Sequence, residues 1–353
     1  MVSTHKLVNI LQAYIIRRLF FLFFVIFGVS LLVFSIQYSY GPERRAMLYV
    51  DSPQQAKNIP ELIERYGFKD PIYKQYFRYV KEMSMGNFGY SLVAAMPVWD
   101  AFLQYLPVTI ELNLFVVPLF IIIGIWLGKQ AGIKRNTTYD HVTRILAIIG
   151  WSLPTFLFAL ILLMIFYGQF GLFEPSMLSA NLETYILENP DKYIQYTGMY
   201  TIDGILNGEL DITFDAIKHL FLPVLTQVIV IVAILMRVMR SSMVEEISKD
   251  YVITAQAKGV DSKTIFNKHV QRNALIPVIT IAGQLAALSM EGSIAVEMIF
   301  NRHGIGNWLA NAALKLDTSV IMFMCLFMAV IFVFTNLIID LLYAYIDPRI
   351  RLT

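Results

Sequence analysis

Six long apolar runs separated by polar stretches dominate this sequence. A helix needs about twenty predominantly apolar residues to cross a bilayer, and each run is close to that length. The runs lie at Leu19–Tyr38, Val108–Gly128, Ile145–Tyr167, His219–Met236, Val278–Phe300 and Val320–Leu342. Because only helices and closed barrels satisfy the backbone in lipid, we predict an all-α integral membrane fold with six transmembrane helices.

The runs divide the chain into segments that we use as a domain map. These are an N-terminal segment (1–18), a first transmembrane helix (19–38), an external loop or cap (39–107), a core transmembrane domain (108–342) and a C-terminal tail (343–353). Inside the core lie an acidic external loop at 168–218 and a polar segment at 243–277. Within the cap we predict short helices near 56–66 and 72–83.

The basic residues indicate which connections face the cytoplasm. None of the 28 Lys and Arg lies in an apolar run, and sixteen of them lie in the termini and in the second and fourth connections. The loop at 168–218 instead holds two basic and eight acidic residues. By the positive-inside rule, both termini and the segment Met243–Pro277 are cytoplasmic. The cap carries eight basic residues, but a loop of about seventy residues has little influence on orientation.

Composition agrees with a membrane protein. The chain is 57% hydrophobic and 15% charged, which is far from an ordinary soluble domain. A plasma-membrane location is implied by the family resemblance given below. A net charge of only +2 gives no support for nucleic-acid binding. The single cysteine, Cys325, excludes a disulfide framework and a cysteine-based zinc site.

The polar segment Met243–Pro277 predicts two short helices hinged at Gly259. Lys258 lies in the last turn of the first helix, where a cation suits the helix dipole. Gly259 supplies the left-handed residue that commonly closes a helix, and Asp261 caps the second helix through its side chain. Such a hinged pair suits docking into a groove of a partner protein. The alternative is an amphipathic loop that lies on the lipid surface.

Enzyme motifs are missing from the sequence. The five histidines are scattered, without His-Glu-x-x-His, and no Gly-x-Ser-x-Gly occurs. The stretch Gly124-x-x-x-Gly128-Lys129 is not a phosphate loop, because it has three residues between the glycines where four are needed. We therefore predict no catalytic, cofactor or metal site in this chain.

Two carboxylates, Glu291 and Glu297, lie within the fifth apolar run, where a charge is costly unless it faces a bundle interior, a partner or water. Gln284, Ala287 and Glu291 share a helical stripe, which either lines a central pathway or makes a buried structural hydrogen bond. We expect Glu297 to reach lipid headgroups or to pair with Arg302. On one helix the two carboxylates lie about 240° apart and do not converge as an acid and base pair.

Two further carboxylates, Glu111 and Asp340, lie near the ends of their runs. We expect both side chains to be interfacial, because charged groups near the end of a span can reach the headgroup region.

Several motifs resemble one known family. The stretch D-Y-V-I-T-A-Q-A-K-G, followed by H-V-Q-R-N-A-L-I-P, resembles the cytoplasmic loop of importer-type ABC permeases in the dipeptide/oligopeptide branch. Within that branch, the chain resembles the B-type inner-membrane component. The resemblance extends over nearly the whole chain. It includes Gly28-Val29-Ser30, L-P-V-T-I-E-L, Gly86-x-x-Gly89-x-Ser91, Leu316-Asp317 and Asp347-Pro348-Arg349.

The resemblance implies a type I permease fold in which the polar segment is a coupling helix that docks on an ATPase subunit. Ala255 and Gly259 match the family's Ala and Gly positions, whereas Ile253 stands where this branch often has Arg. The docking residues implied are Tyr251, Thr254, Ala255, Ala257, Lys258, Gly259 and Asp261.

The function implied is the permease subunit of an ATP-driven importer, which takes up a short peptide or similar solute delivered by an external binding protein. The implied partners are a paralogous permease subunit, two ATPase subunits that bind ATP and Mg²⁺, and membrane lipid. Relatives of the same architecture take up oligosaccharides or nickel, so the substrate class stays open.

Two other functions are compatible with six spans. A self-contained ion- or proton-coupled carrier would use Glu291 as its titrating group, but the inverted repeats and broken helices that such carriers often show are not evident. A membrane scaffold or receptor would transport nothing.

Overall fold

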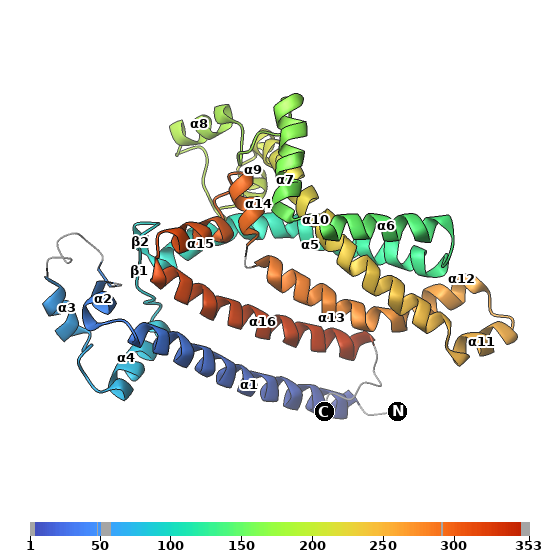
Figure 1. Cartoon of the computed structure of the whole chain (residues 1–353), viewed down its shortest axis with the longest axis horizontal. Helices are drawn as coiled ribbons and strands as arrows, with labels where there is room; N and C mark the ends of the chain where they lie inside the picture. Colours follow the sequence, from blue (N-terminus) through green and yellow to red (C-terminus); the bar gives the residue numbers. More distant parts are fainter. Residues whose placement is uncertain (1–3, 48, 51–57, 291, 347–353) are drawn as a thin grey trace. The chain divides into compact units, whose positions relative to one another are not determined.

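The computed structural model describes residues 4–47, 49–50, 58–290 and 292–346, and this part of the chain is almost entirely helical (Figure 1). Within it, five helices are long and apolar enough to cross a membrane, and a bent helix pair brings the total to as many as six. This agrees with the predicted fold class. The five helices contain the segments Phe20–Tyr38, Val98–Ile133, Leu210–Ile247, Ser262–Met290 and Thr318–Leu342.

The chain folds as two compact units. The first unit contains the chain up to Thr109 and the segment His303–Phe334, and the second contains Ile110–Arg302 and the chain from Thr335 onward. Helices α5 (Val98–Ile133) and α16 (Thr318–Ile346) each contribute residues to both units.

The first unit consists of the first apolar helix, the cap, α15 and the part of α16 up to Phe334. Its short helices near 56–66 and 72–83 were predicted and are confirmed. The elements are α1 (Thr4–Tyr38), α2 (Pro42–Met47), α3 (Ile59–Arg65), α4 (Ile72–Ser84), β1 (Tyr90–Ser91), β2 (Met96–Pro97) and α15 (Ile305–Leu314). The two strands pair antiparallel, with Tyr90 opposite Pro97.

Arg45 holds the cap together from inside. Its side chain is buried, donates hydrogen bonds to the Gln75 side chain and, at 3.0 Å, to the Phe68 carbonyl, and lies over the ring of Tyr38. Burial lowers the pKa of the Arg45 guanidinium. The cap is tied to α1 by the Ser30 and Tyr76 hydroxyls, which lie 2.9 Å apart.

Two of the sequence motifs meet in the first unit, 226 residues apart. The buried carboxylate of Asp317 accepts hydrogen bonds from the Ser91 hydroxyl at 2.9 Å and from the Val93 amide at 3.1 Å. Trp308 donates from Nε1 to the same hydroxyl at 3.3 Å. Gly89, with φ +89°, provides the left-handed turn that leads into Ser91.

Between α5 and α15, the described part of the second unit contains eleven helical elements. They are α6 (Thr138–Ser152), α7 (Thr155–Leu163), η2 (Met164–Gln169), α8 (Ala180–Glu188), α9 (Tyr200–Leu206), α10 (Leu210–Ile247), α11 (Asp250–Ala257), α12 (Ser262–Thr264), η3 (Ile265–Val270), α13 (Gln271–Met290) and, as the last short turn, α14 (Ile294–Ile299).

The third apolar run is not one straight helix. It is split between α6 and the pair α7–η2, which meet at an angle of 97° (Figure 1). Leu153 and Pro154 are extended at the break, with ψ values of 122° and 131°. Proline lacks a donor and disfavours helix in the residue before it, so the predicted disturbance at Pro154 is a sharp corner.

The fifth apolar run also differs from the prediction of a single span at Val278–Phe300. The helix that contains α13 ends at Met290, and Gly292 has φ +86°, a conformation that a helix cannot contain and that suits glycine. Glu297 therefore lies on the separate helix α14, and the 240° argument does not apply to it. Glu291 lies outside the described residues.

The polar segment Met243–Pro277 is mostly helical and continuous with long helices. The fourth run is extended to Ile247 within α10, and the helix after the hinge runs unbroken from Ser262 to Met290 through Pro277 (Figure 1). The first of the two predicted short helices is α11. The second is not short, because it forms the start of the next membrane helix.

A stripe of glycines brings α5 and α10 into close contact. A Cβ on Gly128 would lie 2.6 Å from the Met236 carbonyl oxygen and from Met239 Cβ, and one on Gly132 would lie 2.5 Å from Met243 Cβ. Gly124, one turn earlier, leaves room for Leu235 in the same way. The glycines rejected as a phosphate loop thus serve helix packing, as small residues at four-residue spacing do in membranes.

Gly128→Leu should therefore force α5 and α10 apart. Overpacking a tight contact costs about 1–3 kcal/mol, so the thermal midpoint of the detergent-solubilised protein should fall by several degrees. Gly28→Ala is the control, since a Cβ at that helical glycine meets nothing within 4 Å. Equal midpoints for the two variants would contradict this packing.

Candidate docking segment between α10 and α13

The short helix α11 is held on its inner face by the second unit. Val252 is 1% exposed, and Tyr251 and Ala255 pack against the same core cluster. The Tyr251 hydroxyl donates to Glu246 Oε2 at 2.9 Å and accepts from the Asn273 side chain at 3.4 Å. Burial is the main cause that raises the pKa of Tyr251 to about 12. The phenol therefore stays neutral and anchors α11 to α10.

The outer face of α11 is exposed. Ile253 is 60% exposed, and Thr254 and Ala257 are exposed beside it. Ile253 and Val252 are adjacent in sequence but about 100° apart around the helix, which explains why one is buried and the other is not. Ile253 is the largest apolar side chain that α11 exposes.

The hinge after α11 has the predicted geometry. Gly259 has φ +77° and donates from its amide to the Gln256 carbonyl at 2.9 Å. Asp261 caps the following helix by accepting from the Thr264 amide at 2.8 Å. Its hydrogen bonds with Thr264 lower the pKa of the Asp261 carboxyl. The cap therefore persists at neutral pH and weakens only when the carboxylate is protonated in acid.

The seven predicted docking residues do not share one surface. Tyr251 and Ala255 lie on the inner face against the core. The residues on the exposed side are Thr254, Ala257, Lys258, Gly259 and Asp261. Ile253 was set apart as a departure from the family pattern, yet it has the largest exposed apolar side chain of α11. Its position relative to buried Val252 on the helix could have identified it.

The predicted pathway residues have different environments. Gln284 is exposed and Ala287 is 2% exposed, both on α13, and Glu291 lies outside the described residues. Their role in a pathway stays a prediction.

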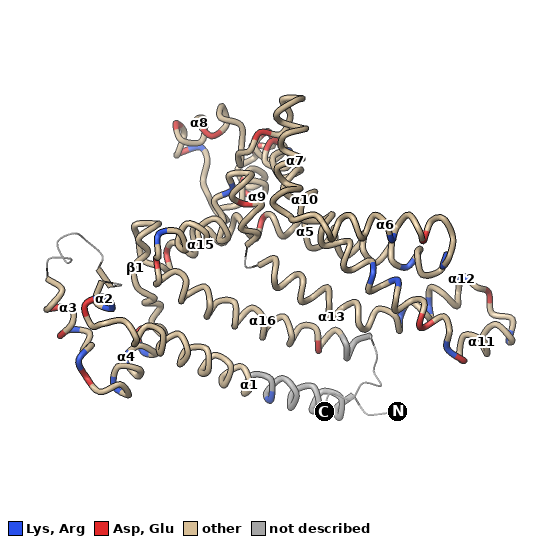
Figure 2. The backbone as a smooth tube through the Cα atoms, in the orientation of Figure 1, with Lys and Arg blue, Asp and Glu red and all other residues tan. Residues whose placement is uncertain are grey.

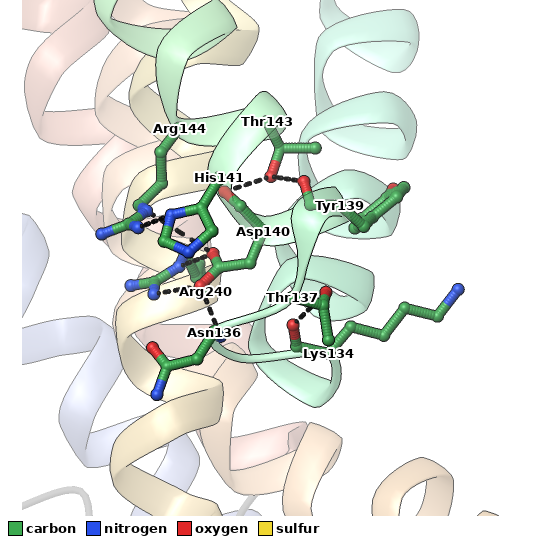
Figure 3. A network of polar contacts seen from close by, with 9 residues as sticks. All are labelled: Lys134, Asn136, Thr137, Tyr139, Asp140, His141, Thr143, Arg144 and Arg240. Carbon is green, nitrogen blue, oxygen red and sulfur yellow. Dashed lines mark hydrogen bonds and ion pairs between the residues drawn. The ribbon is translucent and has the colours of Figure 1, made fainter.

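We call the connection from the end of α10 through α11 to the start of α13 the docking segment. A buried carboxylate joins α6 to α10 close to it in sequence (Figure 3). Asp140 is fully buried and accepts from Arg240 Nη2 at 2.8 Å and from the Asn136 amide at 3.0 Å. Arg144 Nε lies 3.8 Å from the same carboxylate. Because Asn136 belongs to the turn before α6, this network fixes the turn and the helix start to α10, seven residues before α10 ends at Ile247.

A second buried pair was missed by sequence reasoning. Glu111 and Arg302 are each 1% exposed and lie 2.7 Å apart, and the Thr201 amide donates to Glu111 Oε1 at 2.8 Å. The expectation that Glu111 is interfacial is therefore wrong. Glu297 is also 1% exposed, so it does not reach lipid headgroups. No local pattern could pair residues 191 positions apart.

Comparison with known proteins shows which family the chain belongs to. A family profile described as binding-protein-dependent transport system inner membrane component matches residues 120–352, well over half of the chain. The chain belongs to this family. A second profile, for the N-terminal part of binding-protein-dependent transport system membrane components, matches residues 11–113. The two profiles together account for both the cap and the core.

Curated relatives match the chain almost end to end. The dipeptide transport system permease protein DppB of Alkalihalophilus pseudofirmus is 37% identical over 340 residues, which is 96% of this chain and 99% of the relative. The oligopeptide transport system permease protein AppB of Bacillus subtilis is 35% identical, over 97% and 100%. The di/tripeptide transport system permease protein DppB of Pseudomonas aeruginosa is 34% identical, over 96% and 98%.

Family membership confirms the resemblance noted in the sequence. The chain is a multi-pass inner-membrane component of a transport system with the type I permease fold, and it is a permease subunit of an importer, not an enzyme. This decides against the self-contained carrier and against a scaffold without transport.

In this fold, removal of one partner from the pair of Asp140 and Arg240 should lower stability. Asp140→Asn leaves the Arg240 guanidinium without its charge partner, and we expect a loss of about 2 kcal/mol, below the range for fully enclosed pairs because the Arg240 side chain is 20% exposed. The thermal midpoint in detergent should fall. The double variant Asp140→Leu/Arg240→Met should recover most of the loss, because neither charge remains.

Glu245→Gln on exposed α10 surface is the matched control for the Asp140 experiment and should leave the midpoint unchanged. If the loss of stability in the double variant equalled the sum of the losses in Asp140→Leu and Arg240→Met measured singly, the two residues would not be coupled.

Proposed function

We propose that this chain and a homologous second permease form the membrane pathway of an ATP-driven importer for short peptides. Two ATPase subunits bind ATP and Mg²⁺ and dock at the α10–α13 connection, and an external binding protein delivers the peptide. Support for the substrate class comes from the relatives, whose names specify dipeptide, di/tripeptide and oligopeptide transport.

The observation that carries the proposal is the geometry of α11. A helix of eight residues presents Ile253 outward while Val252 and Tyr251 fix it from behind. A partner that pushes on Ile253 therefore moves the ends of two membrane helices, α10 and the helix from Ser262 to Met290. The lipid-surface alternative is less favoured, because α11 presents one large apolar side chain rather than an apolar face.

The charge distribution supports a cytoplasmic position for this connection and for both termini. Lys and Arg lie at the end of α10, on either side of α11 and in α12 (Figure 2), whereas the loop at 168–218 is acidic. The positive-inside rule orients the chain accordingly. The acidic loop and the cap then face the external binding protein, and Gln284, Ala287 and Glu291 are proposed to line the pathway between the two permeases.

Uptake by the assembled transporter should depend on the ATPase subunits. Proteoliposomes that contain both permeases and the ATPases should accumulate a radiolabelled dipeptide only when ATP is inside and the binding protein is outside. Omission of the ATPases should abolish uptake. Uptake that requires a proton gradient and no ATPase would refute the proposal.

Ile253→Asp should weaken docking of the ATPase. If Ile253 is buried in the complex as an anchor, its replacement by a charge costs about 2 kcal/mol or more, which is roughly a thirtyfold loss of affinity. The affinity of purified ATPase subunits for the permease pair in nanodiscs measures this.

Thr138→Asp is the matched control for Ile253→Asp. It adds the same charge at an exposed position on the same side, in the first turn of α6, where a carboxylate suits the helix dipole. Equal affinities for the two variants would show that Ile253 does not contact the ATPase.

A further inference from the structure

Lys129 connects α5 to the helix that follows the docking segment. Its Nζ donates to Asn267 Oδ1 at 2.6 Å and to Gln271 Oε1 at 2.7 Å. All three residues belong to the second unit. Both acceptors are neutral amides, so these contacts are charge-assisted hydrogen bonds, not ion pairs.

The two acceptors lie at the point where the helix changes its winding. Asn267 is within the π-helical turn η3, and Gln271 is the first residue of α13. π-helical turns inside longer helices often occur at functional sites, because they interrupt the regular hydrogen-bond ladder. Ile265 and Val270 of η3 are fully buried in the core cluster that also contains Val252 of α11. One turn of helix is thus held by α11 on its apolar side and by Lys129 on its polar side.

The same end of α5 also contacts α10. Gly128 precedes Lys129 directly and packs against Met239, and Gly132 packs against Met243. Both helices that flank α11 are therefore fixed to α5 within about one and a half turns. At this end, α10 is held by close packing and the helix after the hinge by the Lys129 ammonium group. Near the other end of α13, Asn113 of α5 donates to the Ser289 carbonyl at 2.9 Å.

We propose that Lys129 is a positioning residue for energy coupling. It ties η3 to α5, so that a displacement of α11 by the ATPase moves α5 together with α10 and α13. This rests on the proposed docking of the ATPase at α11. Without the ammonium group, the π-helical turn absorbs the displacement, because its ladder is already interrupted.

The choice of lysine fits this role. An ammonium on a flexible stem has three rotatable donors and keeps two amide acceptors while their separation changes. The planar fork of arginine has fixed geometry and would favour one arrangement of the two amides. The tie can therefore persist while the helices move.

The test is Lys129→Met in the complete transporter in proteoliposomes, with radiolabelled dialanine as the probe. The readout is the amount of dialanine taken up per ATP hydrolysed. We expect this ratio to fall about tenfold or more while ATP hydrolysis continues, because both charge-assisted hydrogen bonds are lost and one alone corresponds to about that factor. Lys134→Met removes the same charge from an exposed residue near the end of α5 and should leave the ratio unchanged.

Variants of the acceptor test the contact itself. Gln271→Leu should lower the ratio, and the double variant Lys129→Met/Gln271→Leu should be no worse than Lys129→Met alone, because coupled residues are not additive. Lys129→Arg should recover part of the ratio. A merely structural role would lower uptake and hydrolysis together, in proportion to the complex assembled, and would overturn the proposal.

A cross-link separates this inference from the proposed function. Ala257→Cys, in a chain with Cys325→Ser, should cross-link to the ATPase with and without Lys129→Met. A retained cross-link with a lowered ratio supports the inference, and a retained cross-link with a normal ratio overturns it alone. No cross-link in the chain that keeps Lys129 would overturn the proposed docking, and the inference with it.

Discussion

The close contact between α5 and α10 is the constraint on which the second unit depends. Glycines at 124, 128 and 132 let the two backbones approach until Leu235, Met239 and Met243 fill the space that side chains would occupy. In lipid this contact has no hydrophobic driving force, so its stability comes from dispersion between well-fitted surfaces. The docking segment is useful only because the helices beneath it form a rigid body. If the α5–α10 contact were loose, α10 could move independently of α5, and a displacement of α11 would not be passed on to α5.

Two buried ion pairs in the second unit join α5 and α10 to segments that are distant from them along the chain. Asp140 and Arg240 join α6 to α10, and Glu111 and Arg302 form an enclosed pair that also holds the Thr201 amide. Buried pairs of this kind contribute less to net stability than to a unique arrangement, because desolvation offsets much of the attraction. Each pair can form in only one relative position of the two segments that it joins, and it therefore fixes their register.

The sequence was informative where structure is local. The apolar runs located the membrane helices, and the cap of Asp261 and the left-handed Gly259 were predicted correctly because both depend on neighbouring residues. It failed where the decisive contact is remote or where an apolar run conceals a break. Glu111 gave no sign of its partner, and the run at Val278–Phe300 contains Gly292, whose positive φ ends the helix. Ile253 was undervalued because a family comparison considered residue identity and not the direction of the side chain.

The corner between α6 and α7 has a consequence for how the protein is made. With 15 residues, α6 is about 22 Å long, which is shorter than the hydrocarbon core of a bilayer, and it carries Asp140, whose charge partner lies on α10. Neither α6 nor α7 alone is a stable insertion unit during synthesis. The pair of Asp140 and Arg240 can form only after α10 has been made, so the start of α6 is fixed in its final place after the fourth span is present.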